Sequence, residues 1–145
     1  MNVLIAEDDM NIRLGLKDLL EAEGYHCTEA EDGEAALAQY HAIKPDLILL
    51  DIMMPKMDGI EVCQHLKGDT SLSFMPIIMV TAKADTKDVV AGLDAGADEY
   101  LTKPVDQTAL VARVKSMLRI KALHDTVQEQ AKQLAEWSRT LEQRV

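Results

Sequence analysis

Side chains able to bind a metal ion or a phosphoryl group follow directly after four short apolar runs of the sequence. In chain order they are Glu7, Asp8 and Asp9, then Asp51, then Thr81, and finally Lys103. Clustered carboxylates repel one another unless a cation joins them. Mg²⁺ prefers oxygen ligands from a few carboxylates, waters and a phosphate. An aspartate carboxylate can also act as a nucleophile and form an acyl phosphate.

These properties assign a possible part to each residue type. The acidic group predicts a Mg²⁺ (or Mn²⁺) site, and Asp51 could accept a phosphoryl group there. Lys103 would neutralise charge on the transferred group together with the metal. The Thr81 hydroxyl could donate a hydrogen bond to a phosphoryl oxygen. This chemistry requires a fold that brings the four segments together.

The hydrophobic pattern predicts such a fold. Apolar runs predict five strands, at 3–6, 25–30, 47–50, 76–80 and 99–101. Helical spacing predicts the intervening helices, at 10–23, 34–43, 59–67 and 85–95. Three of the runs are apolar throughout, as in parallel strands covered on both faces by helices. We therefore predict an α/β fold, a doubly wound flavodoxin-like three-layer sandwich with strand order 2-1-3-4-5. The weak second strand fits an edge position.

In open α/β sheets, functional residues gather at the carboxyl ends of the strands. Strands one, three, four and five are neighbours in the predicted order. Their ends would therefore bring the carboxylates, the hydroxyl and the ammonium group into one crevice.

Composition excludes several other classes of protein. The 145 residues carry 15 Lys and Arg against 25 Asp and Glu, a net charge of −10. A net anion repels phosphates, and aromatic residues make up only 3%, so we expect no direct contact with nucleic acid. No apolar run is long enough for a membrane span. We read Cys27 and Cys63 as buried reduced thiols of a cytoplasmic protein.

The charge also divides the chain into two parts. Residues 1–104 carry 8 basic and 20 acidic side chains, a balance of −12, whereas residues 105–145 carry 7 basic and 5 acidic, a balance of +2. The second part has no Gly and no Pro, and good helix formers fill it. A helix from about 107 to 145 would span roughly 58 Å. Its C-terminal half must therefore project from the domain.

Apolar residues recur every seven positions in this second part, as in one core row of a coiled coil. They are Ile120, Val127, Leu134 and Leu141. If these are a positions, the d positions are Leu123, Gln130, Trp137 and Arg144. If they are d positions, the a positions are His124, Ala131, Ser138 and Val145. Neither register is ideal, so we expect modest pairing, into a homodimer of undetermined direction. A single solvated helix is the alternative, and it is marginal in water without a partner.

Taken together, these segments resemble the receiver domains of two-component response regulators. Asp46-Leu-Ile-Leu-Leu-Asp51-Ile-Met-Met-Pro55-Lys-Met-Asp58-Gly59 is similar to the phosphoacceptor segment of that family. Ile5 to Asp9 resembles its acidic segment, and Thr81-Ala82 and Gly96 to Pro104 resemble its remaining signatures. The matches fall in family order at family spacing, from residue 2 to about 120. The resemblance implies domains at 1–120, the receiver, and 121–145, a linker helix continuous with the fifth helix.

The resemblance also implies a role for each matching residue. Asp51 resembles the phosphorylated aspartate and Lys103 the lysine that pairs with the phosphoryl group. Glu7 and Asp8 resemble the acidic pair that binds Mg²⁺, in which Asp8 would coordinate the ion directly and Glu7 would contact it through a water molecule. The backbone carbonyl of Met53 would be a further ligand.

Three further positions carry structural or switching roles in the family. Thr81 and Tyr100 resemble the switch pair, in which the hydroxyl moves to the phosphoryl group and the aromatic ring turns inward. Pro104 would hold the preceding peptide, often in the cis form. Asp58-Gly59 reads as a turn into the third helix. Val105 departs from the family, in which Phe is common, and this affects packing rather than chemistry.

The predicted function is a signalling switch rather than a stand-alone enzyme. A histidine kinase or phosphotransfer protein would phosphorylate Asp51, and the change would pass through the fifth helix to the dimerising helix and a downstream output. Receivers with such a helix resemble those fused to nucleotide cyclases or other signalling outputs, and we expect the sequence to be cut inside a longer linker. A short regulator with a dimerising tail is the alternative.

Two other functions compete with this prediction. A haloacid-dehalogenase-like phosphatase would need an acid two residues after its Asp nucleophile, where this chain has Met53. A flavodoxin would need a Ser/Thr/Gly-rich phosphate loop after the first strand, where this chain has acidic residues.

Overall fold

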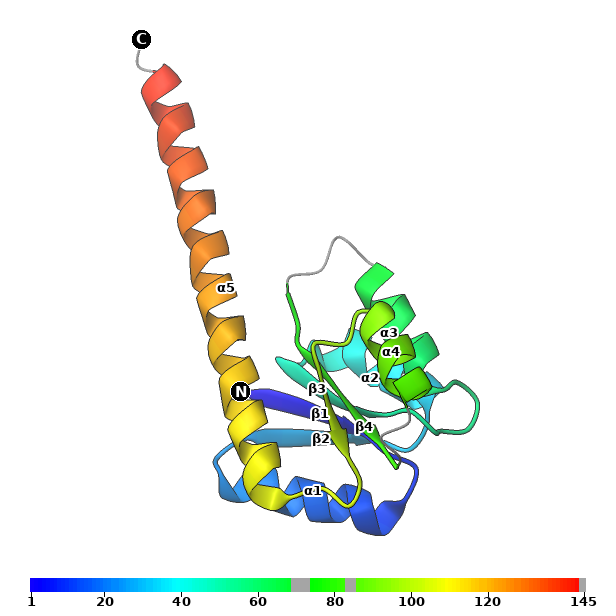
Figure 1. Ribbon diagram of the computed structural model, residues 1–145. Helices are drawn as coiled ribbons and strands as arrows, with labels where there is room; N and C mark the ends of the chain where they lie inside the picture. Colours follow the sequence, from blue (N-terminus) through cyan, green and yellow to red (C-terminus); the bar gives the residue numbers. More distant parts are fainter. Residues whose placement is uncertain (69–73, 83–85, 144–145) are drawn as a thin grey trace.

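The computed structural model describes residues 1–68, 74–82 and 86–143. Strands and helices alternate along the chain (Figure 1). The strands are β1 (Asn2–Ala6), β2 (His26–Ala30), β3 (Leu47–Asp51), β4 (Ile77–Thr81) and β5 (Glu99–Thr102). The helices are α1 (Met10–Ala22), α2 (Gly33–Ile43), α3 (Gly59–Gly68), α4 (Thr86–Asp94) and α5 (Gln107–Gln143). Every predicted element is present to within a few residues, and the predicted start of the fourth helix, Asp85, lies outside the described residues.

The five strands form one parallel sheet in the order β2-β1-β3-β4-β5. The predicted order is therefore confirmed, and β2 lies at an edge as its weaker apolar pattern indicated. β3 and β4 are buried along their whole length, because helices cover both of their faces.

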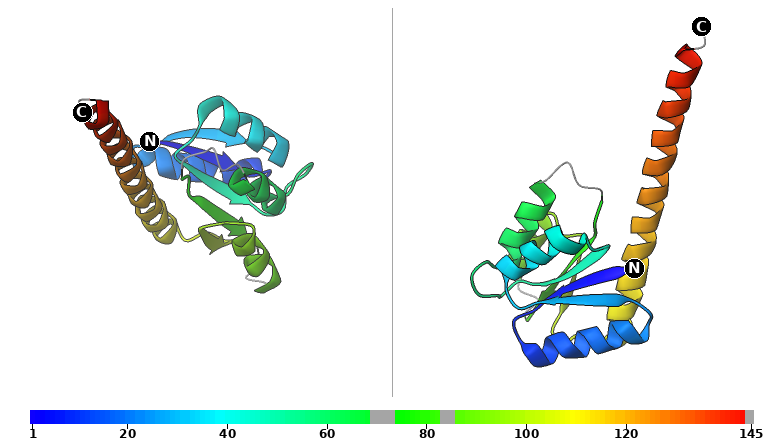
Figure 2. Two further views of the ribbon diagram at one scale, coloured as in Figure 1. Left: turned by 90° about the horizontal axis from the view of Figure 1, so that it is seen from above. Right: turned by 180° about the vertical axis from the view of Figure 1, so that it is seen from behind.

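Alternate residues of each central strand contribute their side chains to two separate hydrophobic cores, one on each face of the sheet. Leu4, Ile48 and Ile77 lie in the core that α2 and α3 cover, and Val3, Leu47 and Ile78 lie in the core that α1 and α5 cover. The view from above shows the two helical layers on either side of the sheet (Figure 2). The period-two side-chain alternation of a strand produces this division.

Short polar side chains cap the starts of the helices, and a residue in the left-handed backbone conformation follows the end of α1. Asp9 caps α1 by accepting hydrogen bonds from the N–H groups of Asn11 and Ile12, and Asp32 caps α2 through Ala35 N–H. Gly24, with φ of +93°, turns the chain after α1. Three residues, Glu7 to Asp9, therefore connect the end of β1 to the start of α1.

Helix α5 is 37 residues long, and only its first half packs on the domain. Leu110, Val114 and Leu118 are buried in the core beside α1, and Lys121 is buried at the margin of the domain. Beyond that point the helix projects away from the sandwich, as predicted from its length (Figures 1 and 2). None of the helices in the described ranges combines the length and apolarity needed to cross a membrane.

One aromatic contact joins the departing helix to the rest of the domain. The ring of Phe74, which precedes β4, stacks on His124 of α5 with 4.4 Å between centroids. The ammonium of Lys67 lies 5.3 Å from the same ring and 3.1 Å from Asp98 Oδ2. Asp98 Oδ2 also accepts a 2.8 Å hydrogen bond from Ile77 N–H. This contact places the start of the projecting segment beside the amino end of β4.

Candidate phosphoacceptor and metal site

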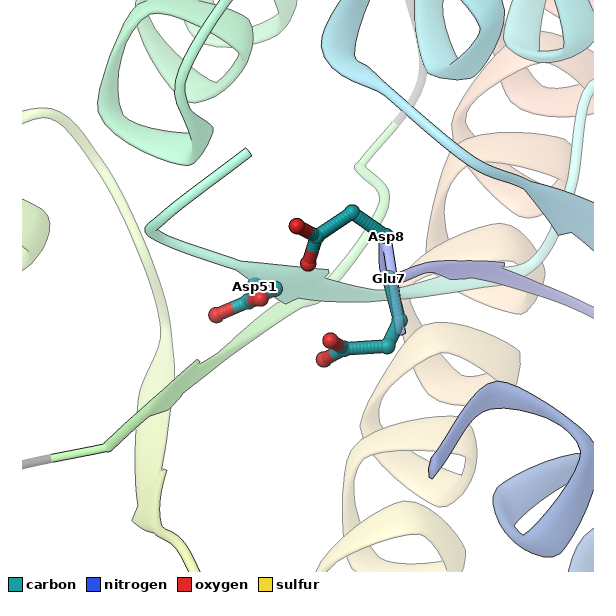
Figure 3. A group of neighbouring side chains, drawn as sticks. All are labelled: Glu7, Asp8 and Asp51. Carbon is teal, nitrogen blue, oxygen red and sulfur yellow. The ribbon is translucent and has the colours of Figure 1, made fainter. Parts of the chain in front are cut away.

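The predicted site residues lie together at the carboxyl edge of the sheet. Asp51 is the last residue of β3 and Thr81 the last of β4, whereas Glu7 and Lys103 directly follow β1 and β5. Because these four strands are adjacent and parallel, their carboxyl ends open onto one space. Figure 3 shows the carboxylates of Glu7, Asp8 and Asp51 gathered about that space.

Ligand oxygens of the three acidic residues lie within 4.8 Å of one another. Glu7 and Asp51 are only 2% and 3% exposed, whereas Asp8 is exposed. The cluster is therefore half enclosed, with two carboxylates in the floor and one at the rim.

Lys103 links the two buried carboxylates. Its ammonium nitrogen lies 2.8 Å from Glu7 Oε2 and 3.2 Å from Asp51 Oδ2. The N–H of Lys103 donates a 2.7 Å hydrogen bond to the carbonyl of Thr81, which fixes this segment against β4. The peptide bond between Lys103 and Pro104 is cis, as the resemblance implied.

Burial dominates the electrostatics of the site. It raises the pKa of Glu7 to about 7, with a further increase from the charge of Asp51 and an opposing effect of Lys103. Burial also raises the pKa of Asp51, although Lys103 counteracts it. Burial alone would lower the pKa of Lys103, but its contacts with Glu7 and Asp51 outweigh that effect and raise it. One ammonium group thus only partly compensates the carboxylates, which favours a second cation.

The donor set fits a hard divalent cation. Glu7 Oε2 is buried and lies 2.8 Å from the ammonium nitrogen of Lys103. All three cluster ligands are carboxylates, the oxygen donors that Mg²⁺ prefers. The Met53 side chain is 73% exposed, and its backbone N–H donates to Asp51 Oδ1 at 3.4 Å. Met53 therefore adjoins Asp51 through its backbone.

A close backbone approach shapes the loop after β3. A Cβ atom on Gly59 would overlap the carbonyl oxygen of Asp51, so only glycine fits where α3 begins. Gly59 N–H also donates to the carbonyl of Ile52 at 2.9 Å. The Asp58 carboxylate accepts from Glu61 N–H at 2.8 Å, at the start of α3. At the predicted turn, the chain therefore packs closely against the backbone of Asp51 and holds it in place.

Thr81 and Tyr100 lie on the same face of the sheet. β4 and β5 pair Met79 with Tyr100, two residues before Thr81, and alternate residues of a strand share a face. Thr81 is buried, whereas Tyr100 is 37% exposed. The structure thus places a buried hydroxyl and a partly exposed ring on the same face of neighbouring strands, two positions apart in register, on the α4 side of the sheet.

Sequence reasoning missed some residues that support the site. Arg13 donates a 2.8 Å hydrogen bond to the carbonyl of Glu7 and forms a 3.0 Å ion pair with Glu29. Lys56 lies 3.6 Å from Asp32, which ties the loop after β3 to the cap of α2. The Arg13–Glu29 and Lys56–Asp32 ion pairs join residues 16 and 24 positions apart, so no local pattern indicates them.

The fold and the site together define a class, that of parallel α/β sandwich domains with a carboxylate cluster and a lysine at one sheet edge. Within this class, the chain belongs to the response regulator receiver domain family, whose model matches residues 3–115. The phosphatase and flavodoxin alternatives are therefore not retained.

Curated relatives are response regulators. The transcriptional regulatory protein CseB of Streptomyces coelicolor is 43% identical over 118 residues, which is 81% of this chain and 49% of CseB. The DNA-binding response regulator MtrA of Mycobacterium tuberculosis is 44% identical over 117 residues, which is 81% of this chain and 50% of MtrA. The chain thus spans about half the length of these relatives.

Solved receiver domains share the architecture. The receiver domain of the Francisella response regulator 1452 superposes with a TM-score of 0.75 at 35% identity and covers 81% of this chain and 96% of that one. A CheY-like receiver domain protein of Methanospirillum hungatei gives a TM-score of 0.78 at 34% identity, covering 83% of this chain and 95% of that one.

Proposed function

We propose that this chain accepts a phosphoryl group on Asp51 from a histidine kinase or a phosphotransfer protein and thereby acts as a signalling switch. The observation that carries the proposal is the environment of Asp51. Its carboxylate is buried, lies 3.2 Å from the ammonium of Lys103 and lies within 4.8 Å of the Glu7 and Asp8 oxygens. The receiver family and the response-regulator relatives support the same function.

The transfer forms one bond and breaks another. A carboxylate oxygen of Asp51 attacks the phosphorus atom, and the P–N bond to the donor imidazole breaks. The imidazole nitrogen keeps the electron pair and takes up a proton. Lys103 stays beside the phosphoryl oxygens and balances part of their charge. Water then hydrolyses the acyl phosphate in a reaction that the same residues promote.

Glu7, Asp8, Asp51 and the carbonyl oxygen of Met53 would hold a divalent cation, Mg²⁺ or Mn²⁺. Such an ion, when bound, supplies positive charge to the oxygens of the transferring group. The chain's own residues would position it, because Glu7 is buried in the floor of the cluster and Asp8 is exposed at its rim.

The switch would run through Thr81 and Tyr100. A phosphoryl group adds roughly 1.5–2 negative charges and offers new acceptors to the Thr81 hydroxyl. As that hydroxyl moves toward the site, space opens on the α4 side, and the half-exposed Tyr100 ring turns inward. The surface around α4, β5 and α5 changes as a result.

Acetyl phosphate labelling tests this function. We expect the intact protein to gain the mass of one phosphoryl group in the presence of Mg²⁺ and none with a chelator. Asp51→Asn should abolish the gain. Asp58→Asn is the matched control, since this aspartate lies in the same loop but caps α3, and it should be labelled like wild type. Labelling that survives Asp51→Asn would falsify the assignment of the acceptor.

A further inference from the structure

We propose that the projecting half of α5 pairs with a second copy of this chain as a parallel, in-register, two-stranded coiled coil. The a positions are Ile120, Val127 and Leu134, and the d positions are Leu123, Gln130 and Trp137. These six residues form what we term the α5 seam. The proposal goes beyond the phosphoacceptor function and does not rest on it.

The seam faces away from the receiver domain. The buried residues of α5, Leu110, Val114, Leu118 and Lys121, follow helical spacing along the side that packs on the domain. The apolar seam residues lie on another side. Ile120 is 38% exposed, and Leu123, Val127, Leu134 and Trp137 are each 62–64% exposed. Large exposed apolar side chains in a continuous row mark an interaction surface.

Charges avoid the seam and its flanks. Between residues 120 and 139 the charged side chains are Lys121, Asp125, Glu129, Lys132, Glu136 and Arg139. All of them fall at the b, c or f positions of this register, on the outer side of a paired helix. The flanking e and g positions are His124, Ala131 and Ser138, and Thr126 and Gln133. Two identical copies can therefore approach without like charges meeting, which is the condition that self-association requires.

The structure also chooses between the two registers that the sequence leaves open. The competing register places His124, Ala131 and Ser138 in the core. His124 is already stacked on Phe74 of its own domain, at 4.4 Å between ring centroids. Its ring therefore faces the receiver, and the apolar residues Leu123 and Trp137 occupy the core row instead.

Gln130 specifies the direction of pairing. It is the single polar residue among the described seam positions. In a parallel, in-register pair its side-chain amide meets the same amide of the second copy, and the two can hydrogen-bond. In an antiparallel pair a d residue faces an a residue, so Gln130 would face an apolar side chain and remain unsatisfied. The β-branched Ile120 and Val127 at a also favour two parallel strands.

Disulfide trapping tests direction and register in the full-length chain. Trp137→Cys should form a covalent dimer under mild oxidation, because equivalent d positions face each other in the proposed pair. Arg139→Cys, at an outward f position two residues away, is the matched control and should not. An antiparallel pair would instead cross-link Trp137→Cys to Ile120→Cys in a mixture of the two variants, and that result would overturn the proposal. The native thiols are buried and do not interfere.

Sedimentation equilibrium tests the part played by Gln130. Gln130→Leu should lower the dissociation constant by about tenfold or more, since a polar core residue confers specificity at a cost in stability. Gln130→Glu should raise it by a similar factor, because two carboxylates would meet in one layer. A wild-type chain that stays monomeric at every concentration, or a Gln130→Glu dimer as tight as wild type, would contradict the proposal. Acetyl phosphate labelling of the same variants reads out the Asp51 function separately.

Discussion

At the scale of single residues, the site is governed by an imbalance between buried charges. Glu7 and Asp51 are almost wholly buried, and the ammonium of Lys103 contacts both of them. Burying these two carboxylates beside a single ammonium group lowers the stability of the fold, and a bound cation would offset that cost. The position of Asp51 depends in turn on a glycine with no chemistry of its own.

Substituting Gly59 should disturb the site without touching a charged group. In Gly59→Ala the new Cβ would overlap the carbonyl of Asp51, so we expect a loss of roughly 2 kcal/mol or more in the free energy of unfolding, as for other steric insertions into packed positions. Urea denaturation measures it. Gly15→Ala is the matched control, because nothing lies within 4 Å of a Cβ there and the change should stabilise α1 by about 0.5–1 kcal/mol. Equal effects of the two substitutions would contradict the steric explanation.

The two thiols should give a pH dependence of stability. Burial raises the pKa of Cys27 and of Cys63 from 9.0 to about 11. Unfolded thiols then ionise while the folded ones stay protonated, so their contribution is complete below pH 9 and is lost as pH rises from 9 to 11. The upper limit of the loss is about 1.4 kcal/mol per pH unit and thiol. Urea denaturation at pH 8, 9 and 10 measures it.

The control for this effect is the double variant Cys27→Ala/Cys63→Ala. Lysine and tyrosine side chains also titrate in this range, and the double variant retains them. Its stability should therefore fall less steeply with pH than that of the wild type, and identical slopes would count against the thiols as the cause.

Residue types and their order after the strands predicted the carboxylates, Thr81 and Lys103 at one edge. The sequence could not show which acids are buried, because burial depends on how α1 and the loop after β3 close over the edge. The sequence also grouped Asp9 with the other acids after the first strand, whereas the structure shows it capping α1.

At the scale of elements, neighbouring acids after β1 have separate tasks. Asp9 accepts hydrogen bonds of 2.9 and 3.1 Å from the first turn of α1, whereas the exposed Asp8 belongs to the acidic cluster. Asp9→Ala should therefore cost about 1 kcal/mol of stability and leave the affinity for Mg²⁺ nearly unchanged. Asp8→Ala should change stability by less than about 0.5 kcal/mol and weaken Mg²⁺ binding. Calorimetric titration with Mg²⁺ and thermal unfolding of both variants separate the two roles, and a common loss of both properties would refute the division.

The Phe74–His124 stack should couple the loop before β4 to the departing helix. Aromatic pairs contribute about 0.5–1.5 kcal/mol beyond their buried area. A double-mutant cycle with Phe74→Ala and His124→Ala should therefore give a coupling of that size, and hydrogen exchange around residue 124 should rise in either single variant. Phe74→Ala combined with His26→Ala, a change at an exposed position in β2, is the additive control. Zero coupling for the stacked pair would show that α5 is held by its buried residues alone.

The elements themselves were largely predictable. Uninterrupted apolar runs indicated β3 and β4 as central strands, and a weaker run indicated β2 as an edge. The stack between Phe74 and His124 was not predictable, because it joins residues fifty positions apart through no local pattern.

At the scale of the whole molecule, we expect the receiver domain to fold without the projecting half of α5. The two hydrophobic cores use described residues from Val3 to Leu118, so a chain shortened to residues 1–126 should unfold cooperatively and should be phosphorylated by acetyl phosphate like the full chain. It should sediment as a monomer, because it lacks most of the α5 seam. Failure of the shortened chain to fold would show that the domain depends on the extension.

The two ends of the packed half of α5 lie at opposite edges of the sheet. The helix begins four residues after Lys103, at the carboxyl edge, and by His124 it has reached Phe74 at the amino end of β4. The chain's N-terminus, where β1 starts, lies beside the same stretch of helix in all views (Figures 1 and 2). We therefore expect a donor protein that approaches Asp51 to stay clear of the projecting segment and of a second chain paired with it. In a pair of joined chains, each Asp51 can be phosphorylated separately. The pair therefore has three phosphorylation states: none, one or both. The singly phosphorylated pair is an asymmetric dimer of two identical chains.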